Sequence, residues 1–175
     1  MNILLCGLPG VGKTTCGQQA AQMLDWSFID LDKRLENLYH ENTGETKSCR
    51  KIFQQDGEAI FREWERLALA TLKTENPCIV ALGGGILEHP GNHKLIKNFG
   101  FVIYLQAEAE NVWPRVETTL RAFINPDNAK GSFLALAECR HDQYVDVCNA
   151  IIDVNGLETE EIVEKIIETA KVYHG

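Results

Sequence analysis

A short glycine-rich loop between a buried strand and an amphipathic helix constrains this chain more than any other feature. Residues 7–14 read GLPGVGKT and match the pattern G-x-x-x-x-G-K-T, with an apolar run at 3–6 and a helical pattern at 15–24. The glycines let the backbone curl so that its N–H groups point inward at phosphate oxygens. The dipole of the helix that starts there faces the same anion. This unit therefore predicts a binding site for a nucleoside triphosphate.

The residues of this phosphate loop have distinct expected tasks. We expect Lys13 to reach the β- and γ-phosphates and the Thr14 hydroxyl to ligate Mg²⁺. The nucleotide-binding set that the loop predicts comprises Gly10, Val11, Gly12, Lys13, Thr14 and Thr15. The alternative is a glycine turn that holds a lysine by chance, and the strand and helix on either side argue against it.

Strand-like apolar runs alternate with helical patterns along the whole chain. The expected strands cover residues 1–6, 26–29, 78–82, 101–105 and 150–152. This alternation predicts a five-stranded parallel α/β sheet with helices on both faces, in a single domain spanning residues 1–175. Ligands of such sheets bind at the carboxyl ends of the strands, so functional residues should follow the strands directly.

Composition narrows the class of protein. The chain has 175 residues, of which 45% are hydrophobic and 24% charged, as in ordinary soluble domains. A formal net charge of −8 argues against nucleic acid or an anionic membrane as the main partner. Six scattered cysteines without a C-x-x-C motif argue against a zinc site or a disulfide framework. With no signal peptide or membrane-spanning run in the sequence, we expect a cytoplasmic protein.

Two carboxylates, Asp30 and Asp32, follow the second expected strand. Taken alone, they fit a helix N-cap and a first-turn acid that faces the helix dipole. Phosphoryl transfer, however, needs one carboxylate near Mg²⁺ and another near the attacking hydroxyl. Beside a nucleotide site we therefore assign Asp30 to the water shell of the metal and Asp32 to the acceptor hydroxyl.

Three glycines, Gly83, Gly84 and Gly85, end the third expected strand. A flexible turn would use glycine as well. The functional interpretation is a close approach of the backbone to the acceptor substrate, where any side chain would obstruct. The strand end also lacks an acidic residue, so Asp30 or Asp32 would have to serve the metal.

Arginines are the expected anion clamps of this acidic chain. Arg62 lies on the helix before the third strand, and Arg140 lies near the end of the helix before the fifth. Arg115 and Arg121 lie in residues 108–128, a weakly patterned segment that we predict to be a mobile lid. Each could instead be a solvated surface charge, but planar guanidinium groups hold carboxylates and phosphates at two points.

Taken together, these motifs resemble those of shikimate kinases, in order and spacing, over nearly the whole chain. Besides the phosphate loop, the resemblance rests on Phe28-Ile29-Asp30-Leu31-Asp32, Ile52-Phe53, Gly57-Glu58, Phe61-Arg62-x-x-Glu65, Ala81-Leu82-Gly83-Gly84-Gly85 and Arg140-x-x-x-Tyr144. It implies ATP-dependent phosphorylation of the 3-hydroxyl of shikimate, a step of aromatic amino acid synthesis. It also implies a three-layer phosphate-loop fold like that of nucleoside monophosphate kinases, with Mg²⁺ as cofactor.

The resemblance also implies roles for individual residues. Asp32, Arg62, Gly84 and Arg140 would bind shikimate, with the two arginines on its carboxylate. Gly83 and Gly85 belong to the same expected substrate-binding set.

The lid residues are the less regular part of the resemblance. Arg121 would close onto the ATP phosphates, and Arg115 resembles an arginine that stacks on adenine. Arg121 is followed by Ala122-Phe123, where relatives usually have proline and leucines. Without proline the local backbone is less restricted.

The expected reaction is in-line attack of the acceptor hydroxyl on the γ-phosphate, with Lys13, Asp32 and Arg121 as catalytic residues. Gluconate kinases and nucleoside monophosphate kinases are the enzymatic alternatives, because gluconate also carries a carboxylate and a hydroxyl. A non-catalytic domain that senses shikimate and nucleotide is a further alternative. We expect a monomer whose partners are ATP and shikimate.

Overall fold

The protein is described by a computed structural model that covers residues 2–74, 76–119 and 126–174. Five strands form one parallel sheet in the order β2-β3-β1-β4-β5. Their bounds are β1 Asn2–Cys6, β2 Ser27–Asp30, β3 Cys78–Ala81, β4 Gly100–Gln106 and β5 Ala150–Asp153. The predicted five-stranded parallel sheet is therefore confirmed.

Strand β1 is the centre of the sheet and of the core. Ile3 pairs with Ile79 of β3 on one side and with Phe101 of β4 on the other. Ile3, Leu4 and Leu5 are fully buried. A strand that is covered on both faces has no solvent side, so its sequence is a continuous apolar run with no alternation.

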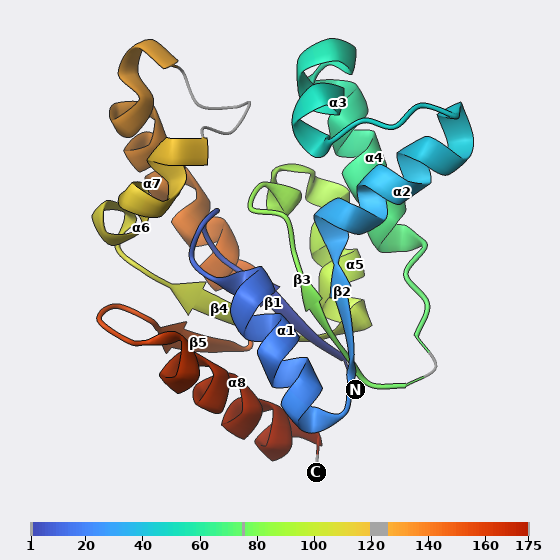
Figure 1. Ribbon diagram of the computed structural model, residues 1–175. Helices are drawn as coiled ribbons and strands as arrows, with labels where there is room; N and C mark the ends of the chain where they lie inside the picture. Colours follow the sequence, from blue (N-terminus) through green and yellow to red (C-terminus); the bar gives the residue numbers. More distant parts are fainter. Residues whose placement is uncertain (1, 75, 120–125, 175) are drawn as a thin grey trace.

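Helices cover both faces of the sheet. Their bounds are α1 Lys13–Leu24, α2 Leu31–Thr43, α3 Cys49–Asp56, α4 Glu58–Ala70, α5 Pro90–Phe99, α6 Ala109–Val116, α7 Ala129–Val147 and α8 Thr159–His174, with short 3₁₀ turns η1 Ile86–Glu88, η2 Glu117–Thr119 and η3 Pro126–Asn128. Helices α1 and α8 pack together on one face, while α5 and α7 pack against the other (Figure 1). The three-layer prediction is thus confirmed.

The segments beyond the carboxyl ends of the strands form two groups. Helices α2, α3 and α4 stand on one side of the phosphate loop, and α6 with the start of α7 stands on the other (Figure 1). Helix α2 begins because the Asp30 side chain accepts a hydrogen bond from the Lys33 backbone N–H at 3.2 Å. It ends at Gly44, whose φ of 76° suits glycine.

The predicted lid, residues 108–128, contains more regular structure than its sequence pattern indicates. Helix α6 continues through Pro114, and η2 and η3 fall in the same segment. Residues 120–125, Arg121 included, lie outside the described residues. Across the described parts of the chain, every helix is too short or too polar to cross a bilayer.

Candidate active site

The phosphate loop connects β1 to α1 through three glycines in left-handed conformations. Gly7, Gly10 and Gly12 have φ values of 139°, 81° and 108°. A Cβ on Gly7 would lie 2.5 Å from the carbonyl oxygen of Leu105, so no other residue fits there. Helix α1 begins directly after Gly12, which leaves its first backbone N–H groups at the loop.

Lys13 folds back over this loop. Its Nζ donates hydrogen bonds to the carbonyl oxygens of Gly7 at 2.8 Å and Leu8 at 2.9 Å. The side chain is buried, with 9% of the residue exposed. The ammonium group therefore lies inside the curl of the loop, where a phosphate group would be its natural counter-ion.

Thr14 and Asp30 form the next part of the site. The Thr14 hydroxyl donates a hydrogen bond to Asp30 Oδ2 at 2.9 Å, while Asp30 Oδ1 caps α2. A hydroxyl and a carboxylate supply the hard oxygen atoms that Mg²⁺ prefers, and Mg²⁺ commonly keeps several waters beside one carboxylate. This pair therefore fits the magnesium position that the sequence predicts.

One pocket of about 280 Å³ joins the phosphate loop to the segments that follow β2 and β3. The predicted site residues that line it are Gly10, Gly12, Lys13, Thr14, Thr15, Asp30, Asp32, Arg62, Gly83, Gly84 and Gly85. Val11 is buried in the core instead. Arg115 is exposed on α6, which packs against Gly10.

The glycine triplet is the closely packed wall of this pocket. A Cβ on Gly83 would lie 2.8 Å from Asp32 Oδ1. A Cβ on Gly85 would lie 2.7 Å from Arg62 Nη1 and 2.8 Å from Arg140 Nη2. Any larger residue at Gly83 or Gly85 would push these charged side-chain ends aside, which explains the glycines better than flexibility does.

Arg62 and Arg140 approach this wall from α4 and α7. Arg62 Nη1 donates to Glu65 Oε2 at 2.6 Å and to the Gly85 carbonyl at 3.2 Å. Arg140 Nε donates to Glu88 Oε1 at 2.9 Å, and Arg62 Nη2 donates to the other oxygen of Glu88. Both arginines are buried, with 9% and 2% of the residue exposed.

Buried charges at this wall shift their neighbours' proton affinities. Burial raises the pKa of Glu65 to about 7, although the Arg62 guanidinium opposes the shift. Burial by itself would lower the pKa of Arg62, but the carboxylates of Glu65, Glu88 and Glu58 outweigh it and hold that pKa above its usual value. The wall is therefore a network of mutually dependent charges.

Comparison with known proteins decides the family. The sequence model described as shikimate kinase matches residues 9–171. The chain belongs to the shikimate kinase family. It is 34% identical to a shikimate kinase of Burkholderia pseudomallei over 163 residues, which cover 90% of this chain and 85% of the relative. It is also 34% identical to one of Enterococcus faecalis over 172 residues, which cover 97% and 98%.

A solved shikimate kinase structure agrees with the fold. The structure of shikimate kinase from Acinetobacter baumannii in complex with shikimate matches with a TM-score of 0.87 and 28% identity, covering 98% of this chain and 93% of that one. The resemblance read from the motifs is therefore confirmed.

At this shikimate kinase site, the sequence did not predict the roles of Glu88 and Arg50 or the hydrogen bond of Tyr144 to Gly84. Glu88 joins Arg62 to Arg140, and nothing in its sequence context signals that role. Arg50 of α3 lines the pocket, although it looks like a surface charge in the sequence. The Tyr144 hydroxyl donates to the Gly84 carbonyl at 2.5 Å, and its place one turn after Arg140 was the available signal.

Proposed function

We propose that this protein is a shikimate kinase, which transfers the γ-phosphate of ATP to the 3-hydroxyl of shikimate and forms shikimate 3-phosphate. The observation that carries the proposal is that one pocket is lined by Lys13, Thr14, Asp32 and Arg62 together. Family membership and the shikimate-bound relative from Acinetobacter baumannii support the choice of acceptor. The product belongs to the route to chorismate and the aromatic amino acids.

The donor half of the pocket binds ATP. Lys13 exchanges its hydrogen bonds to Gly7 and Leu8 for phosphate oxygens, so the loop need not reorganise to bind the nucleotide. The backbone N–H groups at the start of α1 hold the phosphate chain. Thr14 and Asp30 would hold Mg²⁺, which when bound offsets charge on the phosphates.

The acceptor half orients shikimate. Asp32 orients the attacking hydroxyl and accepts its proton, and its position against Gly83 keeps it at the pocket wall. Arg62 and Arg140 bind the carboxylate of shikimate, which fixes the ring relative to the γ-phosphate. The backbone of the glycine triplet lines the same pocket, next to Pro9 of the phosphate loop, and supports the ring there.

The lid assignments are proposals of the same kind. Arg121 closes onto the transferred phosphate, and Arg115 stacks on adenine from α6, where its exposed position beside the phosphate loop permits the contact. Residues 108–128 then gain order when both substrates bind. We infer that the protein is a cytoplasmic monomer that uses Mg²⁺ as cofactor and ATP as co-substrate. It requires neither nucleic acid nor a membrane.

An assay of ADP release over a panel of acceptors tests this function. We expect turnover with shikimate, and little with gluconate or nucleoside monophosphates. The Lys13→Met variant should retain the fold but lose transfer, because it removes the charge inside the phosphate loop. Faster turnover with gluconate would replace the proposal by another kinase. ATP and shikimate binding without transfer would indicate a sensing domain.

A further inference from the structure

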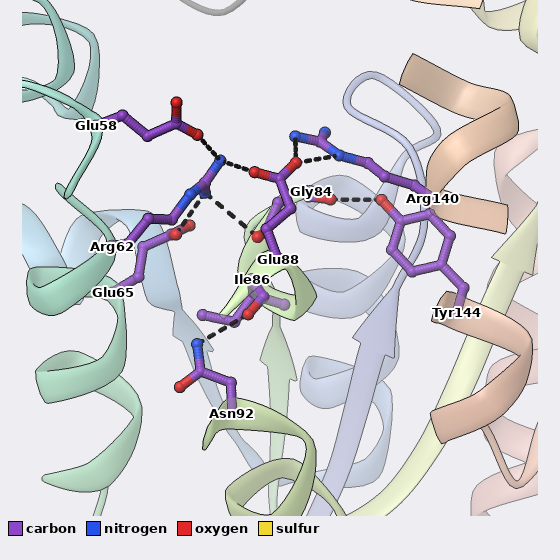
Figure 2. A network of polar contacts seen from close by, with 10 residues as sticks. Glu58, Arg62, Glu65, Gly84, Ile86, Glu88, Asn92, Arg140 and Tyr144 are labelled. Atoms are coloured by element: carbon purple, nitrogen blue, oxygen red, sulfur yellow. Dashed lines mark hydrogen bonds and ion pairs between the residues drawn. The ribbon is translucent and has the colours of Figure 1, made fainter. Parts of the chain in front are cut away.

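Glu88 stands between Arg62, which lines the pocket, and Arg140 (Figure 2). Its Oε1 accepts from Arg140 Nε at 2.9 Å, and its Oε2 accepts from Arg62 Nη2. Glu88 is the last residue of η1, three residues after the glycine triplet. One carboxylate thus binds both guanidinium groups in the way that the carboxylate of an acceptor would.

We propose that Glu88 is a tethered anion that occupies the carboxylate subsite of the acceptor, and that it sets the affinity for shikimate because the substrate carboxylate must displace it. This inference rests on the proposed function, which assigns Arg62 and Arg140 to that carboxylate. It makes Glu88 a specificity-determining residue, although it contacts no reacting atom.

Burial shows which member of the network is able to leave. The side chain of Glu88 is 28% exposed, whereas those of Arg62 and Arg140 are 11% and 2% exposed. Glu88 therefore reaches solvent by rotation about its own side-chain bonds, while the arginines stay in place. Arg62 keeps its contact with Glu65, whose side chain is only 4% exposed, so that guanidinium does not lose its counter-ion.

The charges at this wall favour displacement of Glu88 by the shikimate carboxylate over binding of that carboxylate beside Glu88. The two guanidinium groups already face the carboxylates of Glu58, Glu65 and Glu88. A shikimate carboxylate that joined them would add a fourth anion at a buried wall, which is strongly unfavourable. Replacing Glu88 by the substrate keeps the local charge constant. The binding free energy of the shikimate carboxylate is therefore only the difference between two similar ion pairs, one that it forms with the arginines and one that Glu88 gives up.

Glu88→Gln tests the inference, because it removes the charge but keeps the size of the side chain. We expect the KM for shikimate to fall by about tenfold, the change that a 1.4 kcal/mol loss of competition produces. The kcat and the KM for ATP should stay within about twofold of the wild type, because Glu88 lies outside the donor half. Titration of shikimate binding without nucleotide should show the same gain in affinity.

Glu58→Gln is the matched control. Glu58 also pairs with Arg62, at 3.3 Å, but its side chain is 60% exposed. Its removal should leave the KM for shikimate within about twofold, since exposed pairs contribute little.

The opposite role of Glu88 would be to hold the arginines in place for the substrate. In that case Glu88→Gln raises the KM for shikimate, and either a rise or no change overturns the inference. Glu88→Asp is a second variant if the first folds poorly. Aspartate is too short to hold both arginines well, so we expect an intermediate fall in KM.

The methyl ester of shikimate separates competition from general loosening. It lacks the anionic carboxylate, so removing Glu88 should improve kcat/KM for shikimate more than for the ester. An equal improvement for both acceptors would contradict the exchange. A wild-type protein that fails to phosphorylate shikimate would overturn the proposed function itself. If the wild type phosphorylates shikimate but Glu88→Gln does not lower the KM for shikimate, only this inference is overturned.

Discussion

Asp32 and Glu65 are neighbouring carboxylates with different surroundings, since Asp32 lines the pocket beside Gly83 and Glu65 is buried against Arg62. Phosphoryl transfer uses an ionised carboxylate at the attacking hydroxyl. We propose Asp32, which lines the pocket, for that position. The raised pKa of Glu65 fits a buried partner of Arg62 better than a second group at the attacking hydroxyl.

The Asp32→Asn variant should keep its affinity for ATP and lose turnover. General base catalysis by a positioned carboxylate contributes about 10²- to 10⁴-fold, so we expect kcat to fall in that range. Steady-state kinetics with both substrates varied would measure it. A variant with unchanged kcat would remove Asp32 from the chemistry. Asp30→Asn is the companion variant and should mainly raise the Mg²⁺ concentration that half-maximal activity requires.

The free energy of unfolding should depend on pH through Glu65. Its pKa is about 7 in the folded protein, above the 4.5 of an ordinary glutamate, so the folded state binds this proton more tightly. The contribution of Glu65 to stability is therefore greatest below pH 4.5 and declines as the pH rises through 7. Subtracting the unfolding free energy of Glu65→Gln from that of the wild type isolates this contribution.

We expect that difference to fall by about 2 to 3 kcal/mol between pH 4.5 and 7.5, given about 1.4 kcal/mol for each pKa unit. Urea unfolding at a series of pH values would measure it. A flat or rising difference would show that the Arg62 ion pair outweighs the burial of the carboxyl.

Among the elements, α1 packs tightly on the sheet at Gly17. A Cβ on Gly17 would lie 2.8 Å from Leu5 Cδ1 and 3.0 Å from Phe28 Cε2. Gly17→Ala gains up to about 1 kcal/mol of helix propensity but forces buried side chains to move, which costs about 1 to 3 kcal/mol. We expect a net loss of about 1 kcal/mol, measured by urea unfolding. Gln18→Ala, on the exposed side of α1, is the control.

The strands and helices differ in how well the sequence predicts them. Strands β1, β3 and β4 were predictable because each is an apolar run in the part of the sheet that is covered on both faces. Helix α6 was not, because Pro114 removes a backbone donor from its interior. The helix persists because Val112 and Val116 are buried, and both face the phosphate loop at Gly10. That tertiary packing has no signature in the local sequence.

The residues of the site also differ in whether the sequence could predict them. Residues that follow strands were predictable, since the carboxyl ends of parallel strands meet at one edge, and Asp32 and Gly83 do lie together there. Glu88 was not predictable. Its partners Arg62 and Arg140 are 26 and 52 residues away in the chain and reach it from two different helices.

The whole molecule should respond to its ligands as one unit. ATP-analogue or shikimate binding at a hundred times its Kd stabilises a protein by about 2.7 kcal/mol. For a chain of this size each kcal/mol raises the Tm by about 2 to 4 °C, so we expect each ligand to raise it by about 5 to 10 °C. Calorimetry with Mg²⁺ and a non-hydrolysable ATP analogue, and separately with shikimate, would measure the shifts.

The Lys13→Met variant is the control for the thermal shifts. It should lose most of the shift from the ATP analogue and keep that from shikimate, because Lys13 belongs to the donor half alone.

Near- and far-ultraviolet circular dichroism should report one common transition, as the single-domain prediction requires. Two separate transitions would contradict it.

The central position of β1 has a consequence for the order of assembly. β1 precedes its partners β3 and β4 by a long stretch of chain, as the Ile3 pairings with Ile79 and Phe101 show. During synthesis β1 must therefore wait until β4 has left the ribosome before it is fully covered. A nascent chain arrested before that point would expose β1 and bind holdase chaperones. The phosphate loop packs on Leu105 of β4 and on α6, so it reaches its final surroundings only after those later segments are made.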